Sequence, residues 1–134
     1  MFPAITRLAA LALFTSAVPC AAVGLGPLEK SGVTDGPAKA FYLSLANPYS
    51  TAERFVAEAV GPDDDAPQPR VLVFPSDTIL GAGARRQLLV IVKGLAPGER
   101  YGFRLCAMRA PRPQETLHAR VCSKLVARRL ADRG

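Results

Sequence analysis

Stretches of alternating apolar and polar residues recur along the chain from residue 38 onward. In the first of them Phe41, Leu43 and Leu45 share one face, and Tyr42 and Ser44 lie on the other. Alternation with period two predicts a β-strand with one buried face. The segments that we expect to be strands are Ala38–Ala46, Glu53–Val60, Arg70–Phe74, Gln87–Val92 and Glu99–Met108. Gln87–Val92 is apolar almost throughout, which is typical of a strand that is buried on both faces.

Turn-forming residues separate these segments. The turns are Asn47-Pro48, the acidic loop Gly61–Pro69, Leu80-Gly81-Ala82-Gly83 and Leu95–Gly98. Proline cannot continue a hydrogen-bonded ladder, and glycine permits tight turns. About six or seven short strands with turns every 8–12 residues predict an all-β fold, a single immunoglobulin-like β-sandwich of about seven strands.

The last segment, Leu117–Leu130, fits two periods. With period two, Leu117, Ala119 and Val121 share one face of a strand. With period 3.6, Leu117, Val121 and Leu125 line a basic amphipathic helix of a kind that binds membrane surfaces. We prefer the strand, because the strand before it needs a pairing partner. The helix stays open as the alternative.

The first 22 residues have the order of a secretory signal peptide. Arg7 precedes the uncharged apolar run Leu8–Val18, and small residues follow up to Ala22, after which we expect cleavage. The apolar run is shorter than the roughly 20 residues that cross a bilayer as a helix, and an uncleaved anchor is the alternative. The expected organisation is a signal peptide at 1–22 and one domain at 23–134 in the periplasm.

Cleavage would leave two cysteines, Cys106 and Cys122, in an oxidising compartment. Disulfides form and persist in such compartments, so a bond between the two is the expected state. The alternatives are two unpaired thiols, or one thiol shared with a partner protein.

Composition fits one folded domain without catalytic chemistry. The chain has 134 residues, of which 49% are hydrophobic and 21% charged, which excludes a disordered chain. No Ser, Cys or Lys lies in a motif that would activate it as a nucleophile. His118 is the only histidine, and Asp63-Asp64-Asp65 lacks the alternating ligands of a calcium loop. We therefore expect no enzyme, no cofactor and no metal site.

Positive charge is concentrated near the C-terminus. Residues 100–134 hold nine Lys or Arg and two carboxylates, in a chain of net charge +6. One interpretation is an anionic partner, such as a carboxylate terminus, lipopolysaccharide or another anionic envelope surface. The other is a solvated strand face in an Arg-rich protein. Nucleic acid is not expected, because no pattern of interleaved aromatic and basic residues supports stacking on bases.

Several motifs follow one another in a distinctive order. They are a strand ending in Asn47, then Glu53–Val60, Val73-Phe74-Pro75, Leu80-Gly81-Ala82-Gly83, Gln87–Val92, Glu99–Leu105 and Ser123–Arg128. From about Leu25 to Arg129 this order resembles the N-terminal immunoglobulin-like domain of the periplasmic chaperones of pilus assembly, the chaperone–usher family. The resemblance implies a protein partner, a pilus or fibre subunit, with an usher as a further candidate. The family's second β domain has no counterpart in this sequence.

The resemblance also implies a binding mode. In the family, the last strand of this domain is an edge whose alternating hydrophobic residues fill the groove of a subunit that lacks a strand. The matching residues are Leu117, Ala119 and Val121, on an edge expected along Leu117–Ala127. Lys124 matches a family lysine that anchors the subunit's C-terminal carboxylate. The companion arginine of the family falls at about Gly32, and Lys30 lies two residues away.

A hairpin of the last two strands would bring Cys106 and Cys122 face to face. Arg104, Arg120 and Lys124 would share that face of the sheet. A subgroup of the chaperones with a disulfide between the sixth and seventh strands would correspond. Lys30, Arg104 and Arg120 are therefore candidate anion anchors beside Lys124.

These observations predict a periplasmic chaperone-like protein of pilus, fimbrial or surface-fibre assembly that binds a subunit by strand addition. The alternative is a periplasmic immunoglobulin-like adaptor or structural module without chaperone activity. It is motivated by the glycine at the arginine position and by the single domain.

Overall fold

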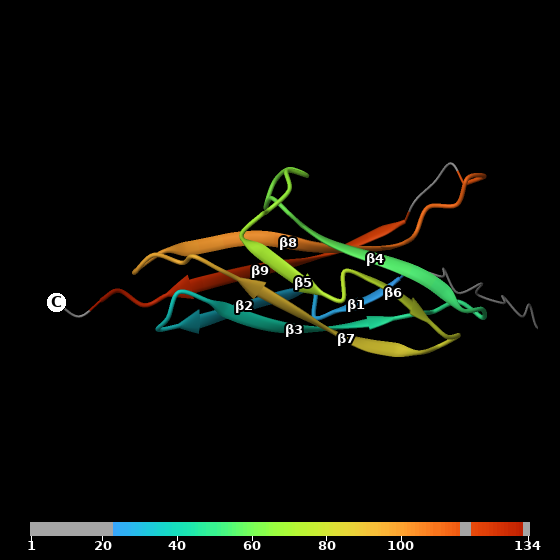
Figure 1. The fold of residues 1–134 in the computed structure, drawn as a ribbon, viewed down its shortest axis with the longest axis horizontal. Helices are drawn as coiled ribbons and strands as arrows, with labels where there is room; N and C mark the ends of the chain where they lie inside the picture. The colour runs from blue at the N-terminus through green and yellow to red at the C-terminus, as the bar shows by residue number, and fades with distance from the viewer. Residues whose placement is uncertain (1–22, 116–118, 133–134) are drawn as a thin grey trace, which may run out of the picture.

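Two β-sheets pack face to face in the computed structural model, which describes residues 23–115 and 119–132 (Figure 1). The four-stranded sheet has the order β1 (Gly24–Gly26), β3 (Lys39–Ala46), β7 (Arg85–Val92), β5 (Val71–Phe74). The five-stranded sheet has the order β2 (Glu29–Thr34), β9 (Arg120–Arg129), β8 (Arg100–Arg109), β4 (Glu53–Val60), β6 (Asp77–Leu80). The all-β prediction of an immunoglobulin-like sandwich is confirmed. Within the described residues there is no helix long and apolar enough to cross a membrane.

Three of the strands, β1, β2 and β6, were not predicted from the sequence pattern. β1 has three residues, two of them glycine, and β2 is mostly exposed. β6 has four residues and begins two positions after Pro75. None of the three repeats an apolar position often enough for its pattern to be read from sequence.

The core lies between the alternating apolar faces of β3 and β8. Phe41, Leu43 and Leu45 meet Phe103 and Leu105, and each of the five is at most 2% exposed. The rings of Phe41 and Phe103 lie edge to face, with centroids 6.4 Å apart. Burial of each large apolar side chain contributes about 1.5–3 kcal/mol, so this contact between the sheets is a main source of stability.

β7 differs from its prediction. Leu88, Val90 and Val92 are fully buried, but Leu89 and Ile91 are only half-buried. The expectation of burial on both faces is wrong, because the second face of β7 is the outer face of the four-stranded sheet. Leu89 and Ile91 are partly covered there by their neighbours on β3 and β5.

The last segment is a strand, and the alternative of an amphipathic helix is wrong. β9 pairs antiparallel with β8 on one side and parallel with β2 on the other. The ladders on both sides use backbone N–H and C=O groups that a helix would instead pair with one another within the segment. Leu117 and His118 lie outside the described residues.

Asn47 joins the end of β3 to the end of β6. Its side chain is 1% exposed, and its Nδ2 donates to the carbonyl oxygens of Thr51 (2.9 Å), Leu80 (3.0 Å) and Gly81 (3.0 Å). Its Oδ1 accepts a hydrogen bond of 2.9 Å from the backbone N–H of Tyr49. One buried amide thus satisfies backbone groups at the end of β6 and in the turn that follows β3.

Replacing Asn47 by alanine should lower the free energy of unfolding by about 2–3 kcal/mol, because buried carbonyl groups would lose their donor. Urea denaturation measures the change. Ser44→Ala, on the outer face of β3, is the control and should stay within about 0.5 kcal/mol of the parent protein. Equal stability of the two variants would contradict the role given to Asn47.

Candidate binding site on strand β9

A disulfide joins β8 to β9. Cys106 and Cys122 are directly opposed in the strand register, with an S–S distance of 2.08 Å and a Cα–Cα distance of 4.0 Å. Both lie on the outer face of the five-stranded sheet, opposite Phe103 and Leu105. The predicted pairing is confirmed, and the bond fixes the register of β9 near its beginning.

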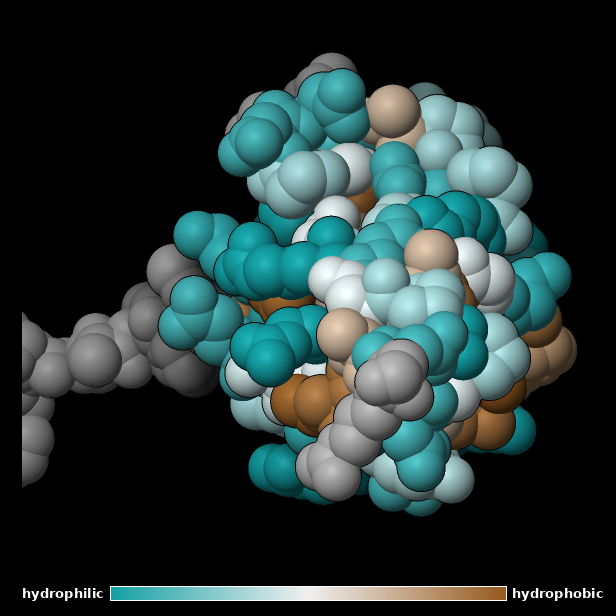
Figure 2. Space-filling model, turned by 90° about the vertical axis from the view of Figure 1, so that its left-hand side faces the viewer, coloured by the Kyte–Doolittle hydropathy of each residue, from teal (hydrophilic) through white to brown (hydrophobic). Residues whose placement is uncertain are grey.

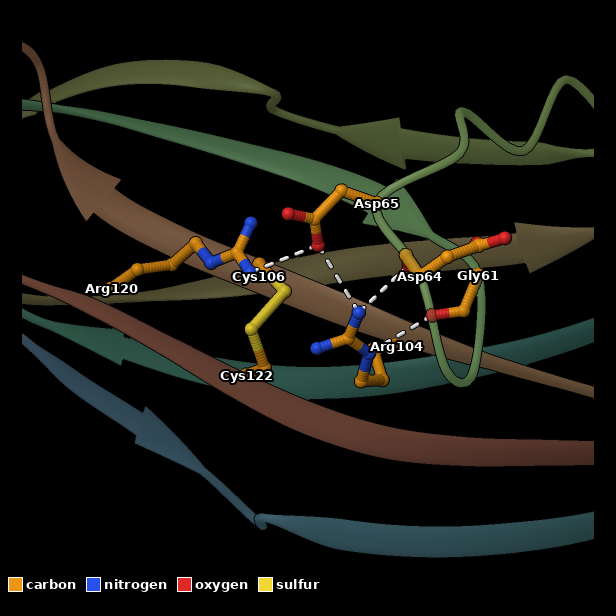
Figure 3. Close-up of a disulfide and its surroundings, with 7 residues drawn as sticks. All are labelled: Gly61, Asp64, Asp65, Arg104, Cys106, Arg120 and Cys122. Carbon is orange, nitrogen blue, oxygen red and sulfur yellow. Dashed lines mark hydrogen bonds and ion pairs between the residues drawn. A yellow bond between two sulfur atoms is a disulfide. The ribbon is translucent and has the colours of Figure 1, made fainter.

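Arg104 and Arg120 hold the acidic loop over this disulfide (Figure 3). Arg104 donates from Nε to the carbonyl oxygen of Gly61 (2.9 Å) and from Nη2 to that of Asp64 (2.7 Å). Asp65 accepts from Nη2 of Arg104 at 3.2 Å and from Nη2 of Arg120 at 3.0 Å. The hydrogen bond from Arg120 lowers the pKa of Asp65, and the charge of Arg104 adds to this effect.

These contacts change the interpretation of the predicted anion anchors. Arg104 and Arg120 already share a carboxylate of this chain, so the site does not bring them to Lys124 as free cations. Lys30 is separated from them as well. Its Nζ lies 3.5 Å from the carbonyl oxygen of Tyr42, on the side of β2 that faces the four-stranded sheet.

Gly32, the position of the family's companion arginine, also faces inward. A Cβ atom at Gly32 would lie 2.4 Å from Cε of Lys39 and 3.3 Å from the ring of Phe41. Lys39 therefore fills the space beside Gly32, and the sequence pattern gave no signal of this. An arginine at residue 32 would require the Lys39 side chain to move away.

A shallow groove of about 670 Å³ lies beside Lys124 on the outer face of β2, β9 and β8. Its lining residues are Glu29, Lys30, Ser31, Gly32, Val33, Arg100, Lys124, Val126 and Arg128. Gly102 is paired with Val126 and has nothing within 4 Å of its Cβ position, so the groove is open there. Arg100, Lys124 and Arg128 form no ion pair within the described residues. The groove is thus lined by four cations, Lys30 included, and one carboxylate, Glu29.

Only the first residues of β9 lie at an edge of the described sheet. β2 pairs with β9 from Lys124 to Arg129, and the N–H of Lys124 donates to the carbonyl oxygen of Leu28 at 2.8 Å. The edge expected along Leu117–Ala127 is therefore wrong from Lys124 onward, because β2 occupies that side. Over Arg120–Ser123 no described strand pairs with β9 on the side away from β8.

The predicted subunit-binding residues lie differently along this edge. Val121 is half-buried and faces the core side of the sheet, and Ala119 is exposed just before β9 begins. Leu117 lies outside the described residues. Lys124 is exposed and marks the point at which the unpaired part of β9 ends.

A buried carboxylate positions the segment that leads toward β9. Glu53 is 7% exposed, and it accepts hydrogen bonds from Arg112 and from Thr51. The bond from Arg112 lowers the pKa of Glu53. Arg109 lies 3.9 Å from Glu53 and also binds Glu115. These ion pairs hold the beginning of the β8–β9 connection against β4.

Solved structures share this fold. SafB, a chaperone of Salmonella enterica in complex with SafA pilin, is 23% identical with a TM-score of 0.68, over 88% of this chain and 59% of that chain. CsuC of Acinetobacter baumannii, a chaperone in complex with the CsuE tip subunit of chaperone–usher Csu pili, is 19% identical with a TM-score of 0.63, over 82% and 53%. The chain shares its fold with pilus chaperones. The resemblance stated from sequence is confirmed in this respect, and the chain spans less than two thirds of the length of these chaperones.

A similar fold occurs in a human protein. The ASH or PapD-like domain of CEP192 is 12% identical with a TM-score of 0.66, and the match covers 98% of this chain and 100% of that domain. No protein-family model and no curated protein sequence matches the chain. The comparisons therefore establish the architecture, and the site must carry the argument for function.

Asp65→Asn should destabilise the protein at neutral pH, because it removes the negative charge that Arg104 and Arg120 share. The folded state lowers the pKa of Asp65 from its usual 3.8. Its contribution is therefore present above that value and is lost as the pH falls through the lower folded value. Melting temperatures of the two proteins should differ at pH 7 and converge toward pH 2. Asp63→Asn is the control, and a constant difference across this range would contradict the assignment.

Proposed function

We propose that this protein is a periplasmic chaperone-like protein of pilus or surface-fibre assembly that binds a fibre subunit by strand addition at the beginning of β9. The observation that carries the proposal is that no strand in the described part of the chain pairs with Arg120–Ser123 on the side away from β8. An exposed strand edge is a template for another strand: backbone hydrogen bonds supply affinity, and alternate side chains enter pockets of the partner.

The side chains along this edge fit such a role. Val121, Ala119 and Leu117 alternate, so they would enter successive pockets of an added partner. The Cys106–Cys122 bond supports the proposal, because it holds the edge in one register while a partner pairs with it.

The cationic groove supplies the second half of the proposed interaction. A bound segment that runs along Arg120–Ser123 would reach Lys124 as the free edge ends. Arg100 and Arg128 line the same groove further along β9, so a carboxylate bound at Lys124 would lie in a region of positive charge. Lys30 also lines the groove, but its Nζ lies 3.5 Å from the carbonyl oxygen of Tyr42, so we do not include it in the proposed anchor.

The cellular location is part of the same proposal. The signal-peptide pattern at 1–22 and the fold shared with chaperones such as the periplasmic SfaE support export to the periplasm. An usher is a further candidate partner. The proposal includes no enzymatic reaction and no cofactor.

The second candidate function is that of an immunoglobulin-like adaptor that binds a folded envelope protein. The match to the CEP192 domain favours it, because that domain has the same fold over its whole length and is not one of the pilus chaperones. The two candidates differ in the state of the partner: a chaperone holds a subunit that aggregates when released, and an adaptor binds a partner that is stable alone.

Capture of the partner from the native host tests the proposal. The tagged full chain is expressed there and purified from the periplasm without reductant, and co-purifying proteins are identified by mass spectrometry. We expect a small fibre subunit in a one-to-one ratio that aggregates once it is released. Val121→Asp should reduce the yield of this subunit about tenfold or more, because a charge would enter an apolar pocket. Val121 also packs against the core, so circular dichroism first checks that the variant is folded.

Ile79→Asp is the matched control, since Ile79 is 71% exposed on the opposite edge strand, β6. This variant should capture the subunit like the parent protein. Equal losses for both variants, or unchanged capture by Val121→Asp, would contradict strand addition at β9. A partner that stays soluble after release would favour the adaptor.

A further inference from the structure

The outer face of the four-stranded sheet carries a continuous apolar surface away from β9. Two rows of side chains cross β3, β7 and β5 at adjacent outward positions: Tyr42, Leu89 and Phe74 form one row, and Ala40, Ile91 and Leu72 form the other. Tyr42 is 52% and Phe74 53% exposed. An exposed apolar area of this kind marks a surface that contacts a protein or a membrane.

Other parts of the surface differ from this face. The end of the molecule seen in Figure 2 is mostly hydrophilic, with hydrophobic atoms in small separate areas. On the five-stranded sheet, half of the outward positions of β8 and β9 are arginine or lysine. Exposed hydrophobic residues also occur there, such as Val33 and Ile79, but each is paired with an arginine and not with a second apolar residue.

Charge on the apolar face has one sign. The four strands of this sheet contain no carboxylate, and their charged residues are Lys39, Arg85 and Arg86. Along β7, Arg85 precedes the apolar rows and Lys93 follows them, both exposed on the outward alternation. The two cations lie eight positions apart along the strand, which corresponds to about 27 Å. The face is apolar in the middle and positive at both ends.

The single sign of charge identifies the class of partner. Two copies of this face related by a two-fold axis would place cations against cations, so the face does not complement itself. Three grooves among the described residues lie elsewhere, and Tyr42, Leu72, Phe74, Leu89 and Ile91 line none of these three. A protein interface normally seats its anchor residues in pockets, whereas a lipid headgroup layer fits a flat surface without them.

We propose that this face, defined by Ala40, Tyr42, Leu72, Phe74, Leu89, Ile91, Arg85 and Lys93, binds the surface of a bilayer that contains anionic phospholipid. Tyr42 and Phe74 would enter the boundary between headgroups and acyl chains, where aromatic rings are favoured. Arg85 and Lys93 would contact the lipid phosphates at the two ends of the face. The proposal does not rest on strand addition, because β9 lies on the other sheet and stays open to a subunit.

Co-sedimentation of the full chain with vesicles tests this proposal. The vesicles contain equal parts of phosphatidylcholine and phosphatidylglycerol, or phosphatidylcholine alone. The parent protein should bind the anionic vesicles more strongly than the neutral ones. All variants keep the same N-terminal residues, so a difference between variants reports on the substituted face.

Two matched comparisons distinguish binding through this face from non-specific attraction of a cationic protein to anionic lipid. Tyr42→Ser with Phe74→Ser should weaken binding about tenfold, and Ile79→Ser on β6 should leave it unchanged. Arg85→Glu with Lys93→Glu should also weaken it about tenfold or more, beyond the effect of Arg100→Glu with Arg128→Glu, which changes the net charge equally. Circular dichroism checks that each variant is folded.

Three results would overturn the proposal. They are no preference for anionic vesicles, equal losses within each matched pair, and binding to a protein that is lost with Tyr42→Ser and Phe74→Ser while vesicle binding is unchanged. The third result would assign the face to an acidic protein partner. Because the β9 variants are separate, none of these results bears on subunit capture.

Discussion

The parallel pairing of β2 with β9 sets the length of the edge on which the proposed function depends. The chain leaves β1 in the four-stranded sheet at Gly26 and enters β2 in the five-stranded sheet at Glu29. β2 can pair with β9 only after this crossing, and its first partner is Lys124. Among the residues that the structure describes, no strand therefore pairs with this side of β9 before Lys124. The crossing and the disulfide together define a short edge that is open on one side and fixed in register.

The distribution of charge divides the outer face of the five-stranded sheet into two parts. Around the disulfide, Arg104 and Arg120 are bound to the acidic loop through Asp65. Beyond it, Lys124 and its neighbours in the groove lack such partners within the described part of the chain. Intramolecular pairing thus occupies the arginines near the free edge and leaves the cations at its end for a ligand. Part of the excess of positive charge seen in the sequence is therefore structural, and we propose that another part binds a ligand.

The sequence predicts strands whose apolar positions repeat, and it predicts a disulfide for which a single pair of cysteines is available. Alternation over eight or more residues identified β3, β4 and β8, because each repeats an apolar face that the core must bury. The two cysteines after residue 22 have one possible intramolecular pairing, and it occurs. By contrast, β2 is polar and is held by its backbone bonds to β9, which no local pattern reveals. The ion pairs of Asp65 with Arg104 and Arg120 join residues that are 39 and 55 positions apart in the sequence. Composition could suggest that such pairs exist, but it could not show which residues form them.

Hydrogen exchange at two neighbouring amides tests the account most directly. In β9 the N–H of Lys124 donates to Leu28, and by alternation the N–H of Cys122 points the same way, beyond the reach of β2. In the isolated protein Cys122 should exchange quickly and Lys124 slowly. In the complex recovered from the periplasm, Cys122 should become protected while Lys124 changes little. Slow exchange of Cys122 in the isolated protein, or an unchanged rate in the complex, would contradict strand addition at this edge.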